Sequence, residues 1–514
     1  MKELLEKLDY KNVLYYFTQI SNVPRGSGHN DKISDFLVEF AKEQGLFFVQ
    51  DTAKNIVIYK PATTGYEEHT PVIIQGHMDM VCVADEGVQH DFQNEGLELF
   101  VDKDWICARG TTLGGDDGIA VAYGMALLAD HTISHPALEV VITTDEETGM
   151  YGAKALDPSL LHGRYLINVD SEDEGIVLAG CAGGVKVTGT LPFRMTENSG
   201  TLIELELKGL LGGHSGAEIN KYRVNAVYEM ARILFDLKKQ EKYLLADLNG
   251  GEKDNAIPNT ASAKILVPDQ SVEKIKEAVF EIFEIHKKEL SGREPGIKLE
   301  ICEKKVDSVF AADDFWMERL LFVLLQAPDG VQKMSSDIDG LVESSLNLGI
   351  FKIKKDPDRS ADHLFCSKEE KPDSKQESYC AEFHFSVRSS ISSYKHFLCD
   401  KLKFLFQFFC GEYKEDGEYP AWEYRKDSPL RKEFIQVFEK VYGRKPQIQA
   451  IHAGLECGLI SEKIPEMDIV SIGPDMKDIH TAKERLCISS SIRVYKFLEE
   501  LLQSMKCEKR PADQ

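Results

Sequence analysis

The chain has 514 residues, of which 43% are hydrophobic and 28% are charged, and its formal net charge is −24. This length and composition are typical of a globular protein with two domains and exclude a disordered or fibrous chain. The acidic balance argues against nucleic acids and anionic membranes as partners, because binding to either needs a basic surface.

The cysteines and the N-terminus indicate where such a protein works. The eleven cysteines are scattered and include no CxxC pair, so we predict neither a disulfide framework nor a cysteine-rich zinc site. The N-terminal segment MKELLEKLDYKNVLYYF lacks the apolar core of a signal peptide. No apolar run approaches the ~20 residues that span a bilayer. We therefore expect a cytoplasmic protein.

The first 185 residues predict two helices followed by strands and helices in alternation. One helix ends at Gly45, and the apolar runs NIVIYK and PVIIQ predict strands. Further strands are predicted in LEVVITTDEE (138–147) and YLINVDSED (165–173), and a Gly-rich turn leads into an apolar helix in TTLGGDDGIAVAYG (111–124). This alternation predicts an α/β domain with a mainly parallel sheet and helices on both faces.

From about Gly183 the strands alternate polar and apolar residues, as an antiparallel sheet with one exposed face requires. The predicted elements are helix 224–239, strand 261–267, helix 272–290, strand 297–306, helix 314–326, strands 345–355 and 379–388, helix 394–409 and strand 412–422. They predict an α+β domain with two related halves. Within it, Lys354–Ser378 is polar and rich in Pro, Ser and Asp, which predicts a mobile surface insertion.

After Trp422 the first pattern returns. Its predicted elements are helix 429–442, strand 448–454, helix 455–461, strand 468–474 and helix 489–503. We therefore predict that the α+β domain, residues 186–423, is inserted into the α/β domain, whose two parts are residues 1–185 and 424–514.

Acidic and histidine side chains follow the apolar runs of the α/β domain. In parallel sheets such groups gather beyond the carboxyl ends of the strands. The residues at these positions are His77, Asp79, Asp116, Glu146, Glu147 and Asp170. His77 and Asp79 are two residues apart, so a strand would put both side chains on one face, where the carboxylate can accept the second ring N–H of a metal-bound imidazole.

These residue types suit a site for two divalent metal ions. Carboxylates from Asp116, Glu147 and Asp170, with one hydroxide, would balance the four positive charges of two zinc-like ions. Such ions can lower the pKa of a shared water and polarise a carbonyl group, while one of the adjacent Glu146 and Glu147 ligates and the other transfers protons. An acidic pair or a histidine alone would predict only a solvated loop or a core side chain. The four motifs together predict a metal site.

Eight motifs resemble those of the aminoacyl-histidine dipeptidases, also called Xaa-His or beta-Ala-His dipeptidases. They are QGHMDMV, TTLGGDDGIA, TDEETGMYGA, NVDSEDEG, GGHSGAEI, NAIP, IHAGLECG and IGPDMKDIHT. These enzymes form a branch of the dinuclear zinc metallopeptidase family that includes glutamate carboxypeptidase, aminoacylase and carnosinase. The resemblance implies a metallo-dipeptidase that hydrolyses Xaa-His and other unblocked dipeptides. Zinc is the expected metal, with cobalt and manganese as alternatives.

The same resemblance implies a role for each site residue in the α/β, or catalytic, domain. The ligands would be His77, Asp116 and Asp170 for one ion and Asp116, Glu147 and His480 for the other, with Asp116 bridging. Glu146 would be the general base, and Asp79 would orient His77. The peptide bond after Asp116 would be cis. This chain carries Asp117 at the next position, where the branch usually has Asn.

The inserted domain would act as a lid. His214 of GGHSG would stabilise the tetrahedral oxyanion, in its own or a neighbouring subunit, and the lid would join a homodimer. Asn255 and Arg388 would hold the substrate, Arg388 by pairing with a carboxylate, and Gly454 would line the cleft. Alternatively, His214 and Arg388 only cap or brace the lid.

Other functions remain open at this point. A tripeptidase, a carnosinase-like enzyme and an N-acyl-amino-acid deacylase would use the same chemistry. From another class, a non-catalytic metal- or peptide-binding protein could share the scaffold. Loss of Glu146 or of a ligand would favour that alternative, and none is lost.

Overall fold

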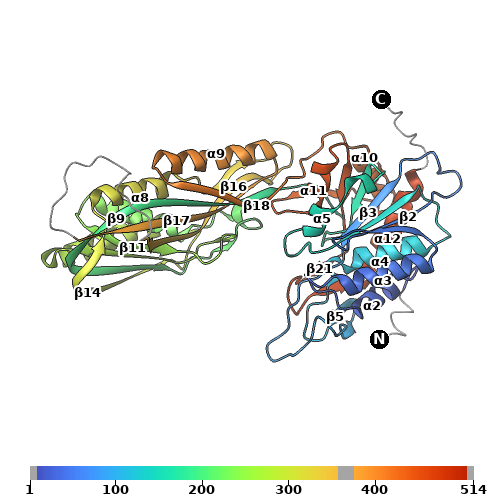
Figure 1. Ribbon diagram of the computed structural model, residues 1–514, viewed down its shortest axis with the longest axis horizontal. Coiled ribbons are helices and arrows are strands. Elements are labelled where there is room, and N and C mark those ends of the chain that lie inside the picture. Colours follow the sequence, from blue (N-terminus) through green and yellow to red (C-terminus); the bar gives the residue numbers. More distant parts are fainter. Residues whose placement is uncertain (1–8, 357–374, 506–514) are drawn as a thin grey trace. The chain divides into compact units, whose positions relative to one another are not determined.

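The computed structural model describes residues 9–356 and 375–505, which form two compact units (Figure 1). Unit 1 comprises Met1–Cys181, Trp422–Ala450 and Leu455–Gln514, and unit 2 comprises Ala182–Ala421 and Ile451–Gly454. Ile451–Gly454 therefore belongs to unit 2, whereas the sequence analysis assigned it to the α/β domain. Most of the predicted insertion Lys354–Ser378 lies outside the described residues.

Unit 1 is built on a sheet with the strand order β1-β2-β6-β3-β7-β20-β8-β19. The strands are β1 (Phe47–Gln50), β2 (Ile56–Lys60), β3 (Val72–His77), β6 (Leu138–Thr143), β7 (Tyr165–Asn168), β8 (Ile176–Cys181), β19 (Gln447–Ile451) and β20 (Asp468–Ser471). The central strands β6, β3, β7 and β20 are parallel, while β1, β2 and β8 pair in antiparallel fashion. The predicted α/β class is confirmed, with the parallel strands forming the centre of the sheet.

A second, four-stranded sheet of unit 1 was not predicted. It has the order β21-β22-β5-β4 and consists of β21 (Met476–Lys477), β22 (Arg485–Cys487), β5 (Trp105–Ala108) and β4 (Leu99–Asp102). These strands are only two to four residues long, so they give little periodic pattern in the sequence.

Helices lie on both faces of the larger sheet. They are α2 (Val13–Ser21), α3 (Asp31–Glu43), α4 (Gly115–Ala129), α5 (Tyr151–Ala155), α10 (Pro429–Tyr442), α11 (Glu456–Lys463) and α12 (Ile488–Ser504). Ile74 of β3 shares one hydrophobic core with α2, α4, α10 and α12. Gln75, which points to the other face, donates a hydrogen bond to Glu456 of α11. None of the described helices combines the length and apolarity needed to cross a membrane.

Close packing of β3 against α4 brings the Gly-rich turn to the end of the strand. A Cβ at Gly76 would lie only 2.3 Å from Ala120 of α4, so glycine permits the approach. The turn that precedes α4 therefore meets His77, the last residue of β3.

Unit 2 is an α+β structure with one large antiparallel sheet of order β11-β13-β9-β17-β16-β15, to which β14 and β18 add by pairing with β9. The strands are β9 (Gly183–Lys208), β11 (Leu244–Gly250), β13 (Ala261–Val267), β14 (Lys298–Ala311), β15 (Gly330–Met334), β16 (Val342–Lys355), β17 (Gln376–Ser389) and β18 (Glu412–Tyr419). The helices are α6 (Ala226–Lys238), α7 (Val272–Leu290), α8 (Asp314–Gln326) and α9 (Ser392–Phe408).

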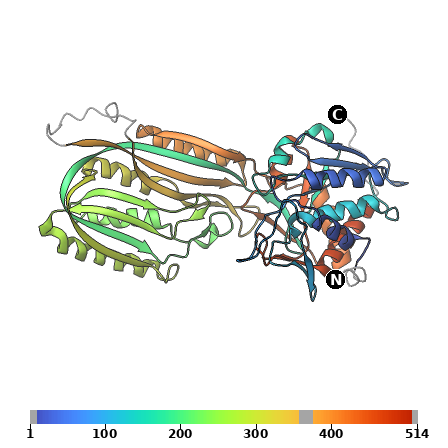
Figure 2. The ribbon, with the colours of Figure 1, turned by 60° about the horizontal axis from the view of Figure 1, so that its bottom comes forward.

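The 26-residue strand β9 connects the two predicted halves of this unit. Its first part pairs with β17 and β18, and its second part pairs with β13 and β14 (Figure 2). Alternate residues such as Val185, Val187 and Leu191 are buried in one core with α6–α9. The halves therefore share a continuous strand and one large hydrophobic core. The predicted strand 412–422 ends earlier, at Tyr419.

Candidate metal centre

The carboxyl ends of the central strands of unit 1 carry the predicted acidic and histidine side chains. His77 ends β3, Asp170 lies two residues beyond β7, and Glu146 and Glu147 follow β6. Asp116 lies in the turn at the start of α4, and its peptide bond to Asp117 is cis, as the resemblance implied. The loop between β21 and β22 adds His480.

The five predicted ligands form two groups that share Asp116. The groups are His77, Asp116 and Asp170, and Asp116, Glu147 and His480, and within each the ligand atoms lie within 4.8 Å of one another. Asp116 Oδ1 lies 3.2 Å from His77 Nε2, and Asp116 Oδ2 lies 3.2 Å from His480 Nε2. Each oxygen of Asp116 thus faces one group, as a bridging ligand requires.

His480 has an unusual backbone conformation. Its φ of 60° lies in the left-handed region, which is uncommon for residues with a Cβ. In this conformation its Nε2 lies 3.0 Å from Glu147 Oε1.

The clustered carboxylates have little access to solvent. The side chains of Asp116, Asp170 and Glu147 are only 12%, 11% and 8% exposed. Burial, together with the neighbouring Asp117 and Asp116, raises the pKa of Asp170 well above its ordinary value. Burial and the carboxylates of Glu456 and Glu147 raise the pKa of Glu146 to about 8. Negative charge in this region is therefore unfavourable unless a cation compensates it.

The two histidines show the complementary effect. Hydrogen bonds to Asp116 and Glu147 raise the pKa of His480 to about 10. Burial lowers the pKa of His77, but hydrogen bonds to Asp116 and Asp79 outweigh it and raise the pKa well above its ordinary value. The space between these groups thus favours positive charge. Carboxylate and imidazole ligands without thiolates suit catalytic zinc or a similar divalent ion, so the donor set fits two such ions.

Asp79 supports the cluster through both of its oxygens. Oδ1 lies 3.4 Å from His77 Nδ1 and accepts a hydrogen bond from the backbone N–H of Glu146 at 3.0 Å. Oδ2 accepts from Ser27 Oγ at 2.7 Å. Because Nδ1 of His77 faces Asp79, its Nε2 faces Asp116 and Asp170.

A buried carboxylate that the sequence analysis missed holds the Gly-rich turn. Glu484 accepts hydrogen bonds from the backbone N–H groups of Leu113, Gly114, Gly115 and Asp116 at 2.8, 2.8, 2.7 and 3.3 Å. Backbone groups that converge on one carboxylate fix the turn, and with it the direction in which the Asp116 side chain leaves the backbone. Glu484 lies four residues after His480 and beyond the end of the motif IGPDMKDIHT, and no side-chain pattern indicates its partners.

A buried guanidinium binds the carbonyl groups of the same region. Arg25 is 2% exposed and donates to the carbonyl oxygens of Met78, at 3.1 Å, and Gly114. Gly114 has a left-handed φ of 64°, and a Cβ there would lie 2.4 Å from the Arg25 guanidinium, so this position requires glycine. Arg25 stands in the loop after α2, where no apolar periodicity points to a function.

The other predicted residues belong to unit 2. The short strands β10 (Gly213–His214) and β12 (Ala256–Ile257) pair His214 with Ala256, next to Asn255. Nδ1 of His214 accepts hydrogen bonds from the N–H groups of Gly216 and Ala217, so the ring proton resides on Nε2. Arg388 and Gly454 both contact Tyr419, and Arg388 lies near enough to His214 that burial and this charge together lower the pKa of that histidine.

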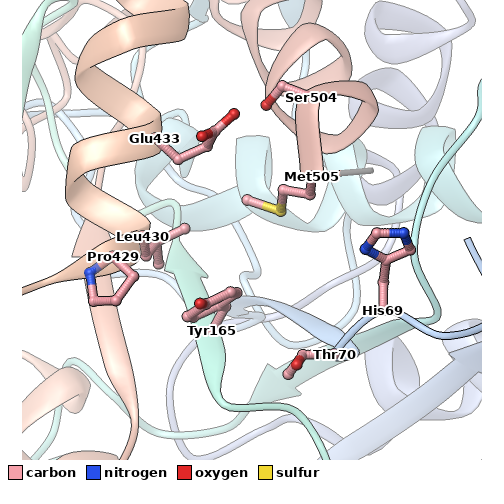
Figure 3. Close-up of a pocket in the computed structure, with 8 residues that line it drawn as sticks. All are labelled: His69, Thr70, Tyr165, Pro429, Leu430, Glu433, Ser504 and Met505. Atoms are coloured by element: carbon pink, nitrogen blue, oxygen red, sulfur yellow. The ribbon is translucent and has the colours of Figure 1, made fainter. Parts of the chain in front are cut away.

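Unit 1 also contains a small pocket lined by His69, Thr70, Tyr165, Pro429, Leu430, Glu433, Ser504 and Met505 (Figure 3). Its volume is about 60 Å³, and none of the predicted site residues lines it. A cavity of this size holds a few water molecules rather than a peptide. The pocket is thus separate from the candidate metal centre.

Comparisons with known proteins agree with this geometry. The model of peptidase family M20/M25/M40 matches residues 73–504, which include all five candidate ligands. The chain belongs to this peptidase family. As a member of this family the protein is a peptide hydrolase, as predicted. Peptidases of the family are metal-dependent, which agrees with the two groups of candidate ligands.

Two relatives are similar to this M20 peptidase over nearly its full length. The cytosol non-specific dipeptidase of Escherichia coli (strain K12) is 35% identical over 494 residues, which cover 95% of this chain and 96% of that protein. The structure of aminoacylhistidine dipeptidase from Vibrio alginolyticus has a TM-score of 0.86 at 33% identity and covers 98% of this chain and 99% of its own. Aminopeptidase PepT from Bacillus cereus shares the fold, with a TM-score of 0.57 at 14% identity over 97% of this chain and 100% of its own.

We expect Glu484→Gln to weaken metal binding by about 10–100-fold, the usual effect of losing a group that holds a ligand in place. Glutamine retains one acceptor oxygen but turns an NH₂ group toward N–H donors. Competition with a chromophoric zinc chelator measures the dissociation constants. Glu86→Gln, which alters an exposed carboxylate of the same unit, is the control. Wild-type zinc affinity in a folded Glu484→Gln protein would show that Glu484 does not position Asp116.

Proposed function

We propose that this M20 peptidase hydrolyses short peptides with free ends, above all dipeptides including Xaa-His, with two divalent metal ions. The observation that carries the proposal is the pair of ligand groups that share Asp116. The relatives described as a non-specific dipeptidase and an aminoacylhistidine dipeptidase support the substrate class. His77, Asp116 and Asp170 would hold one ion, and Asp116, Glu147 and His480 the other.

When bound, two such ions lower the pKa of a water molecule and polarise the carbonyl group of the scissile bond. Zinc is the expected metal, and cobalt and manganese are the alternatives.

Glu146 is the proposed general base. An oxygen of the Glu146 carboxylate and the ligand atoms of His77 and Glu147 lie within 4.8 Å of one another. Glu146 is nevertheless not a member of either ligand group that contains Asp116. Glu146 can therefore take a proton from the attacking water and pass it to the leaving amine without ligating an ion. The hydrogen bond from its N–H to Asp79 holds its backbone beside His77.

The residues of unit 2 have proposed roles in substrate binding. We propose that unit 2, predicted from the sequence as residues 186–423, is a lid domain and that unit 1, predicted as residues 1–185 and 424–514, is the catalytic domain. The Nε2–H of His214 would donate to the tetrahedral oxyanion, in its own or a neighbouring subunit. Asn255, Arg388 and Gly454 would bind the peptide. We also propose a homodimer through the lid and a cytoplasmic location, the latter supported by the description of the Escherichia coli relative.

A substrate panel tests the function. Free dipeptides, their N-acetylated and C-amidated forms, tripeptides, β-Ala-His, N-acyl amino acids and casein are assayed with zinc, cobalt or manganese. We expect unblocked dipeptides to be hydrolysed fastest, Xaa-His among them, and casein not to be cleaved. Preference for N-acyl amino acids or tripeptides would instead indicate a deacylase or a tripeptidase. A folded, metal-loaded protein that hydrolyses none of them would indicate a binding protein.

Replacement of Glu146 by glutamine separates catalysis from metal binding. Because Glu146 lies outside both groups around Asp116, Glu146→Gln should retain both ions while kcat falls by about 10²–10⁴-fold, the usual cost of losing a general base. Steady-state kinetics measure kcat, and elemental analysis of the same preparation measures the number of metal ions per chain. An unchanged kcat at full metal content would remove Glu146 from the mechanism.

A further inference from the structure

Arg388 of unit 2 is a buried cation without a counterion. The residue is 9% exposed. Among the described residues, no carboxylate oxygen lies within 4.0 Å of its guanidinium, so Arg388 forms no ion pair there. Its Nε is buried and, within residues 9–356 and 375–505, has no hydrogen-bond partner. Arginine is rarely buried unless it is paired, because loss of hydration is costly for a charge. This guanidinium therefore lacks an anion.

Burial and the positive charge of Arg388 lower the pKa of two nearby histidines, His214 and His452. After burial, the positive charge of Arg388 is the next cause that lowers the pKa of His214. Burial and Arg388 also lower the pKa of His452 to about 3. His452 is held beside Arg388 by Ser345, whose Oγ lies 2.7 Å from its Nε2 and whose backbone pairs with that of Arg388 between β16 and β17. Burial and the guanidinium disfavour the protonated form of both rings, and an imidazole offers no negative charge to Arg388.

The direction of Arg388 is set by Tyr419, two strands away in the sheet. Arg388 of β17 pairs with Gly184 of β9, and Gly184 pairs in turn with Tyr419 of β18. The three residues therefore form a row across three strands, with a glycine in the middle. Nη1 of Arg388 reaches over Gly184 and donates to the Tyr419 hydroxyl at 2.8 Å.

Glycine is needed on both sides of the Tyr419 ring. A Cβ at Gly184 would lie 2.4 Å from the Tyr419 hydroxyl oxygen, and a Cβ at Gly454 would lie 2.6 Å from the ring. Lys395 of α9, which is 1% exposed, donates to the Tyr419 carbonyl oxygen at 2.8 Å and fixes the backbone. The ring is thus held in one place, and this gives Gly454 a physical role that does not require contact with substrate.

We propose that Tyr419, seated between Gly184 and Gly454, is a positioning residue that aims the unpaired guanidinium of Arg388 at the C-terminal carboxylate of the peptide substrate. The inference rests on the proposed function for the identity of the anion. The carboxylate would supply the missing counterion and accept from the guanidinium, while the hydroxyl keeps Nη1 in place. Tyr419 thereby contributes to selection of free over blocked C-termini without touching the reacting atoms.

Tyr419→Phe, which retains the ring and removes the hydroxyl, tests this role in the metal-loaded enzyme. We expect KM for a free dipeptide such as Ala-His to rise about tenfold with little change in kcat. Hydrolysis of the C-amidated dipeptide should be unchanged, so the preference for the free terminus falls by the same factor. Gly454→Ala, which displaces the ring, should reproduce the effect, and Tyr413→Phe, which removes another hydroxyl of β18, should not.

A double-mutant cycle separates positioning from general stability. In an Arg388→Ala background, Tyr419→Phe should have no further effect on KM, since no guanidinium remains to be aimed. Additive effects of the two substitutions, or an unchanged preference for free termini in Tyr419→Phe, would overturn the proposal.

Binding distinguishes this inference from the proposed function. If the wild-type enzyme hydrolyses no dipeptide, the proposed function fails, and calorimetric titration with Ala-His and its amide then decides the inference. The inference is supported if wild type binds Ala-His more tightly than its amide and Tyr419→Phe binds the two equally. Equal affinities of wild type for the two forms refute it.

Discussion

Repulsion between buried carboxylates at one edge of the unit 1 sheet is the constraint on which the site depends. Asp116 lies within 4.8 Å of Asp170 in one ligand group and of Glu147 in the other, with little solvent to screen the charges. Each additional negative charge raises the pKa of its neighbours, as Asp170 and Glu146 show. The two divalent cations proposed here would offset this repulsion more completely than protonated histidines do. A fold that tolerates this crowding is therefore one that binds metal ions.

Both units hold a charged group in place through a partner side chain, which is buried in unit 1 and partly buried in unit 2. In unit 1 the Glu484 carboxylate gathers the N–H groups of the turn that presents Asp116. In unit 2 the Tyr419 hydroxyl holds the guanidinium of Arg388. A glycine accompanies each contact: Gly114 of the unit 1 turn has a left-handed backbone, and a Cβ at Gly184 would meet the Tyr419 hydroxyl. Functional geometry of this kind exists before a ligand binds, which lowers the cost of binding it.

How much of this could be predicted from the sequence depends on the kind of contact. His77 and Asp170 follow apolar runs that predict strands. Their position at the carboxyl edge of a parallel sheet could therefore be predicted from periodicity alone. His480 came only from the resemblance, because more than 300 residues separate it from Asp170 and no local pattern bridges that distance. Glu484 binds backbone groups and leaves no trace in the side-chain pattern. The contact between Arg388 and Tyr419 depends on strand register across β9, which local periodicity does not fix.

The number of metal ions per chain is the most direct test of the shared ligand. Wild type, Asp116→Ala and Asp170→Ala are saturated with zinc, dialysed mildly and subjected to elemental analysis, with circular dichroism as the control for folding. Two ions are expected for wild type, one for Asp170→Ala and none for Asp116→Ala, since only Asp116 belongs to both ligand groups. Wild-type protein that retains no more than one ion in excess zinc, or Asp116→Ala protein that retains two, would refute a dinuclear centre bridged by Asp116.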